Sequence, residues 1–167
     1  MGTIQASTRP SKVTLSGPHD KVTVFSVNGW DFYGASNVSR DTTLKLVSLV
    51  PNSKYKGESG YPPTASITIE IKDSSAHPAL PKAKREHLKD DADTVTLKTE
   101  HVEVAGGRIA LHHNRNELVD SYEGSVPLTH DKLDVTLTIA RGKRQDELLP
   151  SFMRDFVLVL RSLEMQN

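Results

Sequence analysis

Cysteine is absent from this sequence of 167 residues. Its absence excludes a catalytic thiol, a disulfide framework and any metal site built on cysteine ligands. It does not identify the compartment, because exported proteins can also lack cysteine. No hydrophobic run approaches the roughly 20 apolar residues that a membrane-spanning helix requires, so no transmembrane segment is expected.

An excess of charge of either sign is also missing. Lys and Arg together number 21, and Asp and Glu together number 21. No net field attracts nucleic acid or an acidic membrane, so nucleic-acid binding is not expected. The sequence further lacks a Gly-x-Ser-x-Gly nucleophile elbow, a phosphate-binding loop and a Gly-x-Gly-x-x-Gly motif. We therefore expect neither an enzyme nor a bound cofactor.

The composition that is present is typical of a soluble globular protein, with 36% hydrophobic and 25% charged residues. Residues 1–11 are rich in Ser and Thr and predict a flexible N-terminal tail, and residues 12–167 predict a single domain. The tail has no apolar core of a signal peptide. A cytoplasmic protein and a periplasmic one, whose signal was removed, both stay open.

Alternation of apolar and polar residues predicts β-strands along most of the chain. The predicted strands are residues 13–15, 21–27, 43–50, 66–72, 94–97, 100–105, 108–114, 117–125 and 133–140. Near the C-terminus, residues 146–165 carry an apolar stripe at helical spacing, with Pro150 placed in the first turn because it has no N–H. Residues 82–91 predict a short polar helix. The expected fold class is α+β: an antiparallel β-sheet of about six to seven strands, covered by the C-terminal helix and the shorter polar one.

Two histidines are candidate metal ligands on the clearest hairpin of the chain. A two-residue turn at Gly106-Gly107 pairs His101 with His112 across the two strands, with Glu103 nearby. Two imidazoles and a carboxylate suit a zinc-like ion. The alternative interpretation is an exposed polar pair without a ligand.

Aromatic residues gather in two places and are the candidate partner-binding residues. Trp30 is the single tryptophan, and Phe32 and Tyr33 follow it closely. Tyr55 and Tyr61 lie in the irregular stretch 52–63, which is long enough to be a functional loop. Such a cluster either packs over the edge of the core or lines a groove for an apolar partner.

Three segments resemble the PsbP-like superfamily, which includes the photosystem extrinsic protein, a Ran-binding import factor, DcrB-type lipoproteins and secretion-effector chaperones. Residues 25–30 are similar to its early strand and Gly-Trp turn, with Asn28 where the family has proline. Residues 104–110 are similar to its central hairpin, and residues 133–139 with 152–163 to its closing strand and helix, with Leu163 in place of an aromatic. The resemblance implies layers of helix around an antiparallel sheet and no active site. Members mostly bind other proteins.

The favoured function is a non-catalytic protein-binding accessory factor, chaperone- or immunity-like, that contacts its partner with the sheet or the aromatic edge. One alternative is an exported, lipid-tethered envelope protein. Another is a small-ligand or metal-binding protein that uses His101 and His112. The identity of the partner and the oligomeric state stay open.

Overall fold

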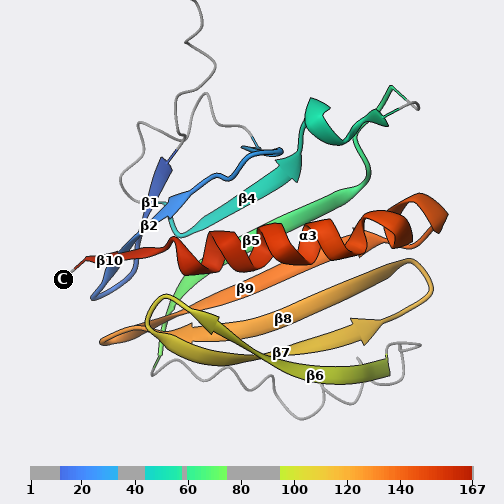
Figure 1. Cartoon of the computed structure of the whole chain (residues 1–167). Coiled ribbons are helices and arrows are strands. Elements are labelled where there is room, and N and C mark those ends of the chain that lie inside the picture. The colour runs from blue at the N-terminus through green and yellow to red at the C-terminus, as the bar shows by residue number, and fades with distance from the viewer. Residues whose placement is uncertain (1–11, 34–43, 58–59, 75–94, 167) are drawn as a thin grey trace, which may run out of the picture.

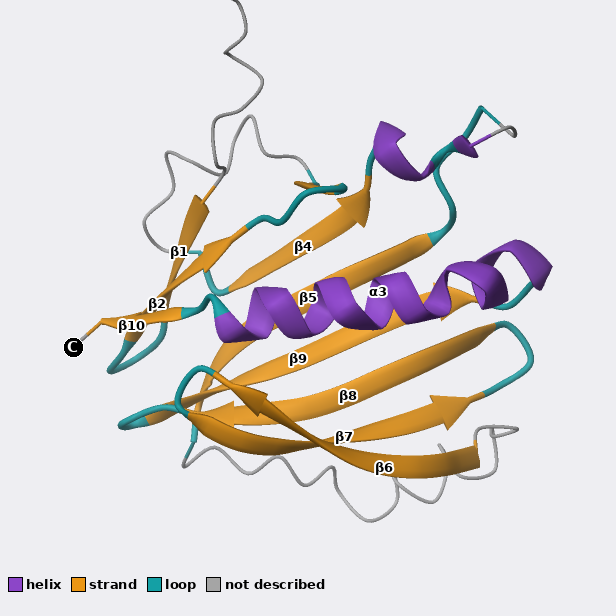
Figure 2. Ribbon diagram, in the orientation of Figure 1, coloured by secondary structure: helices purple, strands orange, loops and turns teal. Residues whose placement is uncertain are grey.

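The computed structural model describes residues 12–33, 44–57, 60–74 and 95–166, which form two antiparallel sheets and one long helix (Figures 1 and 2). The larger sheet has the spatial order β3-β4-β5-β9-β8-β7-β6. Its strands are β3 (Trp30–Phe32), β4 (Leu46–Pro51), β5 (Ala65–Asp73), β6 (Val95–Val104), β7 (Gly107–Arg115), β8 (Val119–Pro127) and β9 (Asp131–Ala140). The smaller sheet has the order β1-β2-β10, with β1 (Lys12–Ser16), β2 (Lys21–Phe25) and β10 (Glu164–Gln166).

The helix α3 (Lys143–Arg161) lies across one face of the larger sheet (Figure 1). Strict alternation in β5 and β9 directs their Ile, Leu and Val side chains to this face, and all of these are buried. The helix contributes a stripe of fully buried residues to the same core: Phe152, Phe156, Val159 and Leu160. Each such side chain contributes about 1.5–3 kcal/mol by leaving water. The predicted fold class, an α+β antiparallel sheet covered by a C-terminal helix, is confirmed.

The predicted bounds of the helix are wrong at both ends. It begins at Lys143 and ends at Arg161, so Pro150 lies inside it and not in its first turn. A proline there removes one N–H bond without ending the helix. Leu163 is buried, so the apolar periodicity runs past the true end and could not reveal it. Beyond that residue the chain becomes β10 and pairs with β2.

The early strands divide between the two sheets. The strand predicted at residues 21–27 is β2 and belongs to the smaller sheet, so it does not lie in the sheet that α3 covers. The chain at Leu44 and Lys45 joins the sheets, because these carbonyl groups accept from the N–H groups of Ser16 and Ile71, both at 2.8 Å. Strands β3 and β10 were not predicted. The predicted tail 1–11 and polar helix 82–91 lie outside the described residues.

The β6–β7 hairpin forms, but its predicted register is wrong by two residues. Val104 pairs with Gly107, so the turn residues are Ala105 and Gly106. A turn of this length can place positive φ at its second central residue alone, and Gly106 supplies it with a φ of 88°. None of the described helices is long and apolar enough to cross a membrane.

Candidate functional site

Three of the five aromatic residues predicted to bind a partner belong to the core. Trp30, Phe32 and Tyr55 are all buried. The rings of Trp30 and Tyr55 each meet Phe152 of α3 edge to face, with centroids 5.3 and 5.1 Å apart. Such packing is the structural alternative that the sequence left open, and it ties the short strand β3 and the turn η2 (Ser53–Tyr55) to the helix.

A buried carboxylate, Asp155, completes this aromatic cluster. Trp30 Nε1–H donates to Asp155 Oδ2 at 2.9 Å, and the hydroxyl of Tyr55 donates to the same oxygen. Arg154 Nε lies 3.5 Å from the other oxygen, Oδ1. Burial, followed by the hydrogen bond to Asp155, raises the pKa of Tyr55 to about 12. The cluster is thus a satisfied polar network that stabilises the fold.

The remaining two aromatic candidates face solvent. Tyr33 is 73% exposed and Tyr61 is 76% exposed. Tyr33 directly follows β3, which is an edge strand of the larger sheet, and its N–H donates to the carbonyl of Ser48. An exposed aromatic beside a sheet edge is a reasonable contact residue. A partner-binding role for these two tyrosines stays a prediction.

The outer face of the larger sheet, opposite α3, carries an open hollow of 740 Å³. It forms where the sheet forks. β7 and β8 pair through His112–Arg115 and Asp120–Glu123, and beyond that point the described pairing of β7 is with β6 alone. The tip of the β6–β7 hairpin turns instead toward the end of α3, where the N–H of Ala105 donates to the carbonyl of Leu160 at 3.2 Å. The hollow is therefore a product of strand twist.

Charged side chains of both signs line this hollow. They are Glu70, Lys72, Arg108, Glu123, Lys132 and Asp134. Lys72 Nζ lies 2.9 Å from Asp134 Oδ2 and 3.7 Å from Glu70 Oε1. Burial of Asp134 opposes its ionisation, but the bonds from Lys72 and Ser125 outweigh this effect and lower the pKa of Asp134. The face is polar and nearly balanced in charge.

The histidines predicted to bind a metal lie on this outer face, but the register of their two strands differs from the predicted one. His101 is opposite Ala110, and His112 is opposite Thr99, whose hydroxyl lies 2.9 Å from His112 Nδ1. The two histidines are thus diagonal neighbours and not a direct pair. Metal binding by His101, His112 and Glu103 stays a prediction. Among the described residues, the group whose ligand atoms can converge on one ion is a different one: His19, Asp73 and Asp131.

Sequence reasoning missed four buried carboxylates, those of Asp20, Asp120, Asp131 and Asp155, although the last three each had a signal. Asp131 continues the inward positions of β9, and Asp120 precedes the inward Tyr122 in β8. Asp155 stands beside Phe156 in the buried stripe of α3. An acidic residue at an apolar position of a clean pattern predicts a buried charge that needs partners. Asp120 has them, because Arg115 Nε and His113 Nε2 lie 2.7 and 2.9 Å from its Oδ1.

The fold and its polar networks define a class of protein: an antiparallel sheet with one face under a long helix and the other face polar. Solved structures of the same fold include the Ran-binding protein Mog1p of Saccharomyces cerevisiae, with a TM-score of 0.50, 13% identity and coverage of 86% of this chain and 89% of that one. A single-site variant of Mog1 matches with a TM-score of 0.50 and 14% identity over 94% of this chain and 96% of that one. The PsbP protein CyanoP of Synechocystis sp. PCC 6803 matches with a TM-score of 0.48 and 13% identity over 99% of both chains.

At the level of the fold, the resemblance inferred from the sequence is confirmed, because the chain shares its fold with the Ran-binding protein Mog1p. No protein-family model matches the chain, and no curated protein matches it in sequence. Identities of 13% and 14% establish the fold alone, and a fold by itself does not assign a function.

Proposed function

We propose that this chain is a non-catalytic protein-binding accessory factor that contacts its partner through the outer face of the larger sheet, at the hollow. The observation that carries the proposal is the hollow itself, a concave surface of 740 Å³ in the middle of a polar sheet face. The helix α3 lies over the opposite face of this sheet (Figure 1). The shared fold adds support, since Mog1p is itself a protein that binds a protein.

The charges of the hollow favour a protein partner over other classes. Arg108 and Glu123 project from β7 and β8 on opposite sides of the fork, and both are exposed. Mixed charges suit the polar rim of a protein interface, whereas nucleic acid or an acidic membrane would select a single positive field. A small molecule would be held more tightly by an enclosed, mostly apolar cavity.

The test is binding by charge-reversed variants. Ran is the first probe, because Mog1p is a Ran-binding protein, and affinity capture from the source cell is the second. We expect the double variant Arg108→Glu, Glu123→Lys to bind its partner at least tenfold more weakly than the wild type does. The control, Lys143→Glu with Glu147→Lys, reverses two exposed charges on α3 and should bind as the wild type does. Equal binding by the first variant, or capture of no stoichiometric partner, would contradict the proposal.

A further inference from the structure

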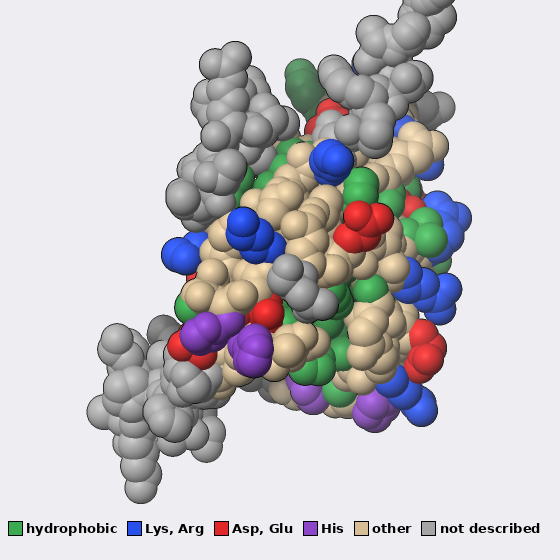
Figure 3. Space-filling view, turned by 90° about the vertical axis from the view of Figure 1, so that its left-hand side faces the viewer, with side chains coloured by type: hydrophobic (Ala, Val, Ile, Leu, Met, Phe, Trp, Pro, Cys, Tyr) green, Lys and Arg blue, Asp and Glu red, His purple; other side chains and the backbone are tan. Residues whose placement is uncertain are grey.

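Three segments that are far apart in the sequence meet at one end of the molecule. They are the β1–β2 turn, the β8–β9 turn and the last residue of β5. This end faces the viewer in Figure 3, where two neighbouring histidine side chains lie beside acidic ones on the surface. The rings of His19 and His130 are 5.7 Å apart there.

Two aspartates clamp the turns together reciprocally. Asp131 Oδ2 accepts from the backbone N–H groups of His19 at 2.9 Å and Asp20 at 2.7 Å. Asp20 Oδ2 accepts from the backbone N–H groups of His130 at 2.7 Å and Asp131 at 2.8 Å. The clamp fits tightly, because a Cβ on Gly17 would come within 2.4 Å of Asp131 Oδ2. The carboxylate of Asp131 is therefore fixed in place by hydrogen bonds to Oδ2, and none of these bonds involves Oδ1.

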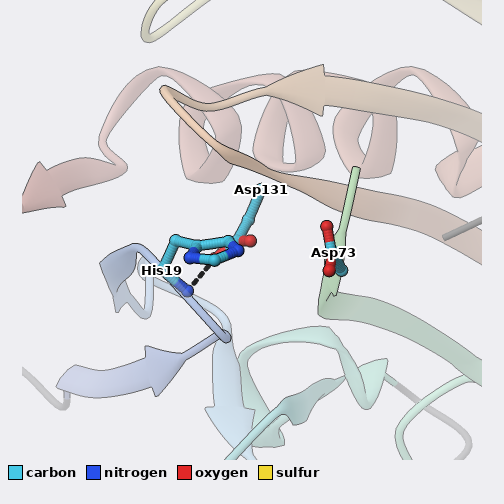
Figure 4. A group of neighbouring side chains, drawn as sticks. All are labelled: His19, Asp73 and Asp131. Atoms are coloured by element: carbon cyan, nitrogen blue, oxygen red, sulfur yellow. Dashed lines mark hydrogen bonds between the residues drawn. The ribbon is translucent and has the colours of Figure 1, made fainter. Parts of the chain in front are cut away.

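That second oxygen has no hydrogen-bond partner within the described part of the chain. Asp131 is 1% exposed, and its Oδ1 is buried without a hydrogen-bond donor among the described residues. Buried carboxylate oxygens are almost always paired, since an unpaired one loses its hydration without compensation. One ligand atom from each of His19, Asp73 and Asp131 lies within 4.8 Å of the other two. Figure 4 shows the carboxylate of Asp131 beside the imidazole of His19.

We propose that His19, Asp73 and Asp131 form a binding site for a divalent transition-metal ion, with zinc and manganese as the best-suited ions. One imidazole nitrogen and two carboxylate oxygens are ligands that both ions accept, whereas calcium prefers oxygen alone. Bonds of about 2.0–2.2 Å place the ligands of a tetrahedral zinc ion about 3.4 Å apart. The side chain of His19 is exposed and can rotate to close that distance around the fixed Asp131.

The ion would join the two sheets. His19 belongs to the turn of the smaller sheet, and Asp73 and Asp131 end two neighbouring strands of the larger one. An ion bound by all three acts as a clip, and its binding energy is added to the stability of the folded chain. None of the three ligands lines the hollow, although Lys72 and Lys132, which do, are adjacent in the chain to Asp73 and Asp131. The inference is argued from the aspartate clamp and does not depend on the proposed function.

The test is calorimetric titration of the untagged chain with ZnCl2 and with MnCl2. The wild type is expected to bind one ion, and His19→Ala and Asp73→Asn are each expected to bind it at least tenfold more weakly. Neither side chain is buried, so both variants should fold, which circular dichroism checks. His130→Ala is the matched control, because it removes the neighbouring imidazole and leaves all three ligands.

Two outcomes would overturn the inference. One is a wild type that binds neither ion at millimolar concentration. The other is that His19→Ala and Asp73→Asn bind the ion as tightly as the wild type does. In that case, weaker binding by His101→Ala would show that the ion lies on the β6–β7 hairpin instead. Broadening of amide signals by Mn²⁺ gives an independent readout. It is expected at Gly17 and at residues 19–20 and 130–131, and broadening confined to residues 99–112 would contradict the site.

Discussion

Asp155 and Asp131 are two equally buried carboxylates in two different situations, with 3% and 1% exposure. Asp155 meets Trp30 and Tyr55 with one oxygen and a guanidinium with the other. Asp131 also accepts from two donors with one oxygen, but the other oxygen has no donor among the residues that the structure describes. The comparison shows that burial alone does not separate a structural charge from a binding one. A complete set of partners marks the first, and an unfilled acceptor marks the second.

The largest effect is expected when the acceptor of the aromatic cluster is removed. Asp155→Leu leaves the indole N–H of Trp30 and the hydroxyl of Tyr55 buried without a partner. We expect it to lower the free energy of unfolding by about 3 kcal/mol, as measured by urea denaturation. Asp155→Asn keeps an acceptor oxygen and is expected to lose only about 1 kcal/mol. Equal stability of the leucine variant and the wild type would show that Asp155 is not structural.

A smaller, pH-dependent effect is expected at Tyr55. Tyr55→Phe removes one donor to Asp155 and should lower the free energy of unfolding by about 1 kcal/mol near neutral pH. The fold raises the pKa of this tyrosine from about 10 to about 12, so its contribution is complete below the unfolded value and is lost as the pH rises through the folded one.

The difference in stability between the wild type and Tyr55→Phe should therefore shrink between pH 10 and about 12. Urea denaturation at pH 8 and pH 11 measures it. Tyr122 has a pKa that burial also raises to about 12, but it is present in both proteins and cancels in the difference. A difference that grows with pH would contradict the hydrogen bond to Asp155.

The smallest effect on the stability of the metal-free protein is expected from a substitution of Asp131. In Asp131→Asn, the amide oxygen can still accept from the N–H groups of His19 and Asp20, and the NH2 group replaces the unpartnered oxygen. We expect a change in the free energy of unfolding of less than about 1 kcal/mol. A loss as large as that of Asp155→Leu would mean that both carboxylates are structural and would remove the contrast between them.

Periodicity in the sequence predicted the centre of this fold and missed its edges. Residues 66–72 and 133–140 alternate cleanly, so β5 and β9 were expected, as was the helix that covers them. The hairpin register was wrong because two adjacent glycines allow two turns, and only packing of the tip against α3 selects one. The short strands β3 and β10 depend on pairing with distant segments, which no local pattern encodes.

The candidate sites were less predictable because they are built from distant residues. His19 and Asp131 are 112 positions apart, and their contact follows from how two turns meet at the end of the molecule. The hairpin histidines were predicted to pair because a turn at Gly106-Gly107 would place them opposite each other, yet the structure places them on a diagonal. The usable local signal was an aspartate at an inward position of β9, where every second residue that follows is apolar and buried.

The most direct measurement is anomalous diffraction from crystals of the wild-type chain soaked in zinc, recorded on both sides of the zinc absorption edge. The two-carboxylate comparison predicts one anomalous peak at bonding distance from His19, Asp73 and Asp131, and none beside Asp155. Absence of a peak at the three ligands, or a peak at His101 and His112 instead, would contradict it.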